Sequence, residues 1–158
     1  MIVERRTRIA APRPRVFDLA RSIDLHVDST GGSDERAVAG VTRGLISGGQ
    51  EVTWEARHFG VRQRFTSRIT AFEAPRHFQD SMVRGAFATF VHDHVFEDAP
   101  GGATDMIDRL VFTAPLGPLG RLVDRAILGP YLARFLDARN AVIRRVAESS
   151  DDWRKYLG

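Results

Sequence analysis

Alternation of apolar and polar residues is the main pattern in the first two thirds of the chain, and it predicts strands. A strand that buries one face places every second side chain inward. The pattern covers residues 2–9, 41–46, 51–58, 61–72, 77–84, 87–97 and 105–113. Two short helices are expected after the first strand, one following the prolines that precede Val16 and one around residues 23–27.

Between residues 119 and 148 the apolar side chains recur every three or four positions, which is typical of an amphipathic helix. This stripe is formed by Leu128, Leu132, Phe135, Leu136, Arg139, Val142, Ile143 and Val146. Gly129 and Pro130 predict a kink or a split, so the long part of the helix is expected at residues 130–148. The order of elements predicts an α+β fold in which this helix covers a curved antiparallel sheet. A cavity beside the helix is the expected result.

The two central strands also predict their own register. With Phe59 and Gly60 as the turn, Trp54 faces Phe65 across the hairpin. Glu55 then faces Arg64, and Glu51 faces Arg68, as cross-strand energetics prefer. Only Arg57 opposite Arg62 is unfavourable, and both lie beside the turn. This register places Trp54 and Phe65 on the inner face, together with His58.

Length and composition narrow the class of protein. The 158 residues suit a single domain over residues 1–158, with roughly the last eight residues expected as a loose tail. The absence of cysteine excludes disulfides and thiolate catalysis. Basic and acidic residues are interleaved and the net charge is +3, which argues against a nucleic-acid partner. Neither a signal peptide nor an integral membrane segment is predicted, so we expect a cytoplasmic protein.

Four segments together resemble the START-like superfamily, also called SRPBCC or polyketide cyclase/dehydrase-like, over nearly the whole chain. They read APRPRVFDLA, GGQEVTWEARHFGVRQRFTSRITAFEAPRHFQD, FVHDHVFE and APLGPLGRLVDR. The ARHFG strand end and the histidine pair are similar to a bacterial subgroup of that superfamily. The resemblance implies a helix-grip fold around a hydrophobic cavity. The superfamily includes lipid carriers, hormone receptors and aromatic-polyketide cyclases, so the resemblance leaves the function open.

Side chains alternate between the two faces of each strand, and on the later strands this alternation places several polar side chains on the same inward face as aromatic ones. The polar residues expected there are His58, Asp80, Arg84, His92, His94 and Asp108. The apolar walls are expected from Trp54, Phe65, Phe90, Met106 and Phe135. A buried charge costs several kcal/mol unless it is paired or neutralised. These polar groups must therefore satisfy one another, hold water or meet a ligand.

His92 and His94 are open to three interpretations. They could bind a zinc or iron ion together with a nearby carboxylate or a third histidine, since a His-x-His pair on a strand supplies suitable ligands. They could act as acid–base catalysts with Asp108, with Arg84 holding an oxyanion, in an aromatase/cyclase or dehydratase reaction. They could instead form a satisfied hydrogen-bond network at the polar end of a cavity. We favour this last interpretation, with a hydrophobic or amphipathic small molecule as the ligand and no cofactor.

Overall fold

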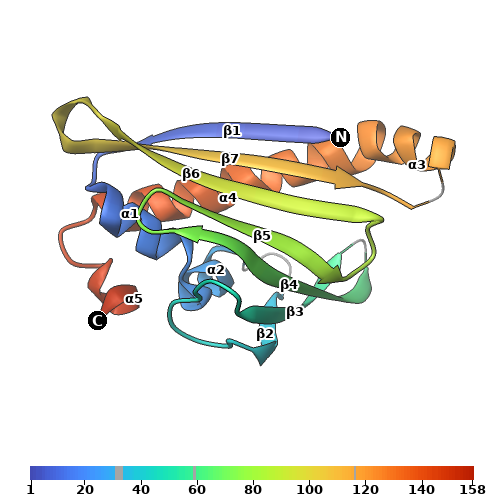
Figure 1. Ribbon diagram of the computed structural model, residues 1–158, viewed down its shortest axis with the longest axis horizontal. Coiled ribbons are helices and arrows are strands. Elements are labelled where there is room, and N and C mark those ends of the chain that lie inside the picture. The colour runs from blue at the N-terminus through green and yellow to red at the C-terminus, as the bar shows by residue number, and fades with distance from the viewer. Residues whose placement is uncertain (31–33, 59, 116) are drawn as a thin grey trace.

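Seven antiparallel strands form one sheet in the computed structural model, which describes residues 1–30, 34–58, 60–115 and 117–158 (Figure 1). The strands are β1 (Ile2–Ile9), β2 (Arg36–Gly40), β3 (Glu51–His58), β4 (Val61–Glu73), β5 (His77–Arg84), β6 (Thr89–Ala99) and β7 (Ala103–Thr113). Their spatial order is β1-β7-β6-β5-β4-β3-β2, so β1 lies at one edge of the sheet beside β7 and β2 lies at the other edge.

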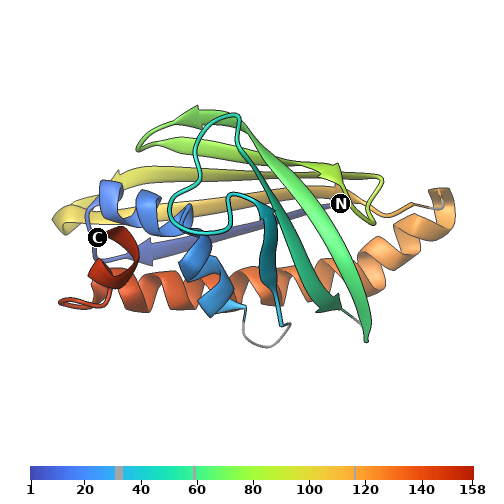
Figure 2. The same cartoon turned by 90° about the horizontal axis from the view of Figure 1, so that it is seen from below.

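The helices lie on one side of this sheet, and Figure 2 shows the long C-terminal helix running along its length. They are α1 (Arg13–Ala20), α2 (Ile23–Ser29), α3 (Gly117–Val123), a π-helical turn (Asp124–Leu128), α4 (Gly129–Glu148) and α5 (Arg154–Leu157), with a 3₁₀ turn at Pro100–Gly102 between β6 and β7. The predicted α+β class, with two short helices after the first strand, is confirmed. The arrangement is a helix-grip fold.

The predicted register of the central hairpin is confirmed. Trp54 pairs with Phe65, Glu55 with Arg64, and Glu51 with Arg68. The Glu55 and Arg64 side chains form an ion pair at 3.0 Å. Phe59, placed in the predicted turn, lies outside the described residues. Charge pairing on one face and aromatic pairing on the other therefore fixed the alignment of these strands.

The strand predicted over residues 41–46 is wrong. The β2 strand ends at Gly40, and a single bridge between Ser22 and Leu45 is the pairing that the structure describes beyond it. Gly40 and Gly44 have φ of 72° and 73°, a left-handed backbone that turns the chain out of the sheet. A Cβ on Gly40 would lie 2.2 Å from the carbonyl oxygen of Glu51, so this close approach requires glycine.

The break predicted at Gly129 and Pro130 takes the form of a π-helical turn. The chain stays helical from Gly117 to Glu148, and Pro130 falls in the first turn of α4. A Cβ on Gly129 would lie 2.9 Å from the carbonyl oxygen of Asp124, inside that turn. The wider turn accommodates the proline, whose missing N–H cannot continue the hydrogen-bond ladder. None of the helices in the described ranges has the length and apolar character needed to cross a bilayer.

The loose tail expected at the C-terminus is also wrong. Trp153, Tyr156 and Leu157 pack against the main apolar core, and α5 forms over this segment. The guanidinium of Arg15 lies 4.4 Å from the centroid of the Trp153 ring. The Tyr156 hydroxyl donates to Asp28 at 2.7 Å. These contacts anchor the tail to α1 and α2.

Candidate functional site

A cavity of about 310 Å³ lies between the inner face of the sheet and α4. Most of its wall is apolar, and side chains from β3 to β7, α2 and α4 contribute to it. The Phe, Trp and Tyr residues on the wall are Trp54, Phe65, Phe78, Phe87, Phe90, Tyr131 and Phe135. The sheet curves around one helix, and the side chains do not fill all the space that this leaves.

One part of the wall carries the polar cluster, which we define as Asp80, His92, His94, Asp108, Arg139 and Asn140. Asp80 comes from β5, the two histidines from β6, Asp108 from β7, and the last two from α4. Strand pairing places Asp80 opposite His92 and His94 opposite Asp108. Residues directly opposite one another in an antiparallel pair share a face of the sheet. The register alone therefore brings these four side chains together.

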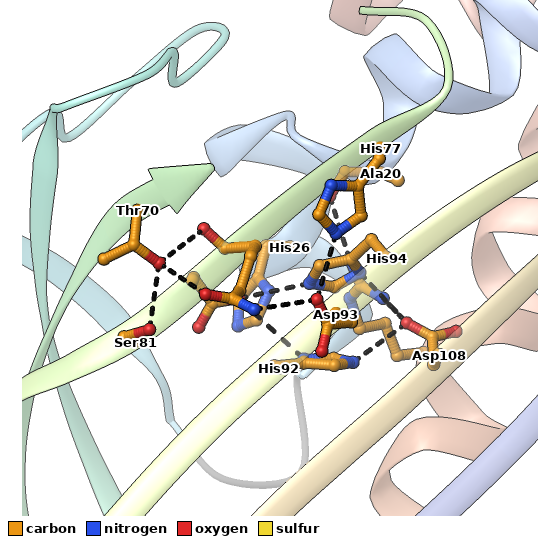
Figure 3. Close-up of polar contacts among 12 residues, drawn as sticks. Ala20, His26, Thr70, His77, Ser81, His92, Asp93, His94 and Asp108 are labelled. Carbon is orange, nitrogen blue, oxygen red and sulfur yellow. Dashed lines mark hydrogen bonds and ion pairs between the residues drawn. The ribbon is translucent and has the colours of Figure 1, made fainter. Parts of the chain in front are cut away.

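Asp108 is the centre of the polar cluster and is fully buried. Its Oδ1 lies 3.0 Å from Nε2 of His92 and 3.0 Å from Nδ1 of His94 (Figure 3). Asn140 donates to its Oδ2 at 2.7 Å, and Arg139 donates to Oδ1 at 3.4 Å. A buried carboxylate is tolerated when it is paired and hydrogen-bonded in this way.

Asp80 is the second carboxylate and lies on the cavity wall. Its Oδ2 is 3.1 Å from Nε2 of His94 and 3.9 Å from Nδ1 of His92. Each imidazole therefore has one nitrogen toward Asp80 and the other toward Asp108. The Phe78 ring stacks on His94, with a centroid distance of 4.1 Å, and limits rotation of that ring.

Burial and pairing shift the pKa values of the four titratable groups in different directions. Burial alone would raise the pKa of Asp108, but hydrogen bonds from His92 and His94 hold it well below its usual range. The pKa of Asp80 is also lowered, because the His94 hydrogen bond and the nearby histidine charges outweigh burial. Burial and the neighbouring His94 charge lower the pKa of His92. The pKa of His94 is raised, because Asp108 and Asp80 outweigh its burial.

These directions describe an electrically balanced cluster. They favour two ionised aspartates, and of the two imidazoles they favour protonation of His94 before His92. With the guanidinium of Arg139, which is always charged, one protonated imidazole would bring the sum of the charges to zero. Such a cluster can be buried without an external counter-ion.

Most of the residues expected at the cavity do lie on its wall. Those placed there are Trp54, Phe65, Asp80, Phe90, His92, His94 and Phe135. Asp108 is behind the histidines, and Met106 is buried in the apolar core. The side chain of His58 lies outside the described residues.

The inward placement of Arg84 is wrong, because its side chain is exposed. A register shift in the β4–β5 pair is the reason. Met82 pairs with Ser67, but Arg84 pairs with Thr66, so Val83 is an extra residue. This bulge reverses the alternation and turns Arg84 to the outer face.

Sequence reasoning missed several polar residues at or beside the cavity, among them Arg139, Asn140 and His26. Arg139 and Asn140 belong to the polar cluster, and Arg139 stood in the apolar stripe of the long helix. A charged residue in such a stripe is a signal for a buried partner. His26 stacks on Trp54 at 4.2 Å on the cavity wall. It lies three residues after Ile23 and therefore on the same helical face.

Asp80, His92 and His94 also form a set that could hold a metal ion. One ligand atom from each lies within 4.8 Å of those of the other two. Two imidazoles and one carboxylate suit zinc or ferrous iron better than calcium or magnesium.

Comparison with known proteins agrees with the fold and gives a family. A family model described as polyketide cyclase / dehydrase and lipid transport matches residues 1–148. Protein TTHA0849 from Thermus thermophilus is similar in structure, with a TM-score of 0.71 and 16% identity over 93% of this chain and 99% of that chain. A START superfamily protein from Mycobacterium smegmatis has a TM-score of 0.70 and 12% identity, over 92% and 98% of the two chains.

Plant proteins share the fold as well. The major latex-like protein 151 from Panax ginseng has a TM-score of 0.64 and 14% identity, over 94% of this chain and 98% of that chain. Identities this low show a common fold only. A search of curated protein sequences gives no match.

Asp108 should carry much of the folding stability. We expect Asp108→Asn to lower the free energy of unfolding by about 3–5 kcal/mol, because it leaves His94 and Arg139 without their buried counter-charge. The matched control is Asp93→Asn, since Asp93 accepts a hydrogen bond from His77 at 3.0 Å but is only half-buried. There we expect a loss of about 1 kcal/mol or less. Urea denaturation measures both, and equal losses would contradict a central role for Asp108.

The two histidines should titrate on opposite sides of their ordinary pKa of about 6.5. We expect His94 to stay protonated above that pH and His92 to stay neutral below it. The raised pKa of His94 contributes stability below about pH 6.5 that is lost as the pH rises through its folded pKa. The lowered pKa of His92 costs stability as the pH falls below about 6.5. Long-range ¹H–¹⁵N NMR against pH checks this, and the reverse order would refute it.

Proposed function

Because the chain belongs to the polyketide cyclase / dehydrase and lipid transport family and has its START-like fold, we propose that it binds an amphipathic small molecule in the cavity. The apolar part of the ligand would lie among the aromatic side chains of the wall, and its polar group would face Asp80 and His92. The observation that carries the proposal is a mostly apolar cavity whose wall includes the polar side chains of Asp80 and His92. Binding sites for small molecules have this composition, because the few polar groups orient the ligand.

The chemistry of the polar end favours a hydroxyl or phenol on the ligand. Asp80 accepts hydrogen bonds, and its side chain is 18% exposed whereas that of Asp108 is 0% exposed. A neutral His92 can accept or donate. A ligand carboxylate at this position would be repelled by Asp80. The cavity volume of about 310 Å³ is at the lower end of the usual range for ligand sites, about 300–1,000 Å³, so a compact ligand fits best.

Filling the cavity should weaken ligand binding without unfolding the protein. Ala56 lies on the cavity wall and is buried, so Ala56→Phe would place a ring where the ligand binds. We expect N-phenyl-1-naphthylamine, a neutral fluorescent amphipath, to bind this variant at least about tenfold more weakly, the equivalent of about 1.4 kcal/mol. Fluorescence titration measures it. Ala71→Phe is the control, because Ala71 on β4 is partly buried but is not on the cavity wall. Unchanged binding by a folded Ala56→Phe protein would refute the proposal.

A second candidate function is acid–base catalysis, and the pairing of His92 with Asp108 favours it. Asp108 lies 3.0 Å from Nε2 of His92, and His92 itself is on the cavity wall. A neutral imidazole held by a buried carboxylate can accept a proton from a ligand near neutral pH. The reaction would be an aromatase/cyclase or dehydratase step.

The two candidate functions, binding alone and catalysis, predict different fates for a ligand that is isolated from the His92→Ala variant. We expect molecules extracted from purified His92→Ala protein to keep their mass after incubation with the wild-type protein, as binding alone requires. Mass spectrometry reads this directly. Loss of water or a new ring, produced by the wild-type protein but not by fresh His92→Ala protein, would instead support catalysis.

A further inference from the structure

We propose that Asp80, His92 and His94 form a binding site for a divalent transition metal ion, with zinc as the representative, and that its open coordination position faces the cavity. The claim concerns a metal ion alone and does not depend on the proposed ligand. It rests on three observations: the spacing of the ligand atoms, the contacts of the opposite ring nitrogens, and the position of Asp108 behind the histidines.

The spacing fits a single small cation. With Zn–N and Zn–O distances of about 2.0–2.1 Å, two ligands of a tetrahedral zinc lie about 3.3–3.5 Å apart. Asp80 Oδ2 lies 3.1 Å from Nε2 of His94 and 3.9 Å from Nδ1 of His92. The first distance is slightly shorter than this ligand–ligand spacing, and the second is slightly longer. The three ligand atoms lie within 4.8 Å of one another. Changes of a few tenths of an ångström in the two Asp80 distances would match them to one ion, which would replace the proton between His94 and Asp80.

The other nitrogen of each imidazole already lies against the carboxylate that a metal-binding histidine requires. Nε2 of His92 is hydrogen-bonded to Oδ1 of Asp108 at 3.0 Å. Nδ1 of His94 lies at the same distance from that oxygen as an ion pair, outside hydrogen-bond geometry. A carboxylate behind the ligating histidines fixes their tautomers and makes the metal-facing nitrogens more basic. Asn140 and Arg139 in turn hold Asp108, by donating to Oδ2 and Oδ1. One buried carboxylate thus orients both rings toward the same point.

The site is open on one side. Asp80, His92 and His94 are on the cavity wall, whereas Asp108 is fully buried behind them. Three protein ligands leave the fourth tetrahedral position for water or an oxygen atom of a small molecule. A dication bound between two neutral imidazoles is offset by the two aspartates. Because Arg139 also carries a charge and the His94 proton is released, metal binding raises the net charge of the polar cluster from zero to +1.

The outer face of the same strands provides a matched control. His77 on β5 and Asp93 on β6 are diagonal neighbours in the strand pair, with an Nε2–Oδ1 distance of 3.0 Å. They form a single histidine–aspartate pair on the partly exposed face of the sheet. They are not part of the group of Asp80, His92 and His94 that could hold a metal ion. His77→Gln therefore removes a histidine from the same strands without touching the proposed site.

The test is a titration of untagged, chelator-treated protein with Co²⁺ and then Zn²⁺. We expect one equivalent of Co²⁺ to give the visible absorption bands of a four-coordinate ion, and one equivalent of Zn²⁺ to remove them. Asp80→Asn should weaken Zn²⁺ binding by about 100-fold or more, since even loss of a supporting residue costs about 10–100-fold. His77→Gln should bind like the wild type. Equal Zn²⁺ affinity in the wild type and Asp80→Asn would overturn the proposal.

A measurement on the wild-type protein alone keeps the test decisive if Asp80→Asn does not fold. Addition of Zn²⁺ should shift the ¹⁵N signals of Nδ1 of His92 and Nε2 of His94, the two nitrogens toward Asp80, and leave those of His77 in place. Shifts confined to His77 or His26, or no histidine shift at one equivalent, would show that the polar cluster holds no metal.

Discussion

The buried carboxylate of Asp108 is the interaction on which the arrangement of sheet and helix depends. It has no exposed surface, so in the folded state its charge must be balanced by protein groups. The histidines of β6 supply one side of that balance, and Arg139 and Asn140 of α4 supply the other. A shift of α4 by one turn would carry both donors away and leave the charge unpaired. Apolar contacts alone tolerate such a shift better, because they are not directional.

The interior around the polar cluster is divided. Two separate apolar clusters fill the described part of the molecule, one around Phe17 and Met106 and one around Leu110 and Phe112. The cavity is lined by residues of both, including Phe78 from the first and Leu110 from the second. The charged side chains of the polar cluster hold one another at hydrogen-bond distance, and the cavity lies beside them.

The parts of the molecule that could be predicted from the sequence are those that follow from the alternation of side chains along a strand and from the pairing of opposite charges across neighbouring strands. The hairpin register, the long helix and the inward row of His92 and His94 came from alternation and cross-strand pairing. Arg84 was misplaced because a single extra residue, Val83, reverses the alternation, and a bulge has no distinct sequence pattern here. The false strand at residues 41–46 has the same origin, since its composition is strand-like while Gly40 and Gly44 set the backbone. Arg139 was missed because its role depends on a contact with Asp108, a residue 31 positions away.

The two aspartates of the polar cluster have different roles because they differ in access. Asp108 is enclosed by groups from the neighbouring strand and from α4, so its charge contributes to the fold and is out of reach of a ligand. Asp80 is held by the same histidines but reaches the cavity wall, with 18% of its side chain exposed. Whatever binds in the cavity, whether a hydroxyl, a proton or a metal ion, must therefore compete for Asp80 and for the ring nitrogens turned toward it. The same histidines also contact Asp108, so binding at the wall would act on the groups that hold α4 on the sheet.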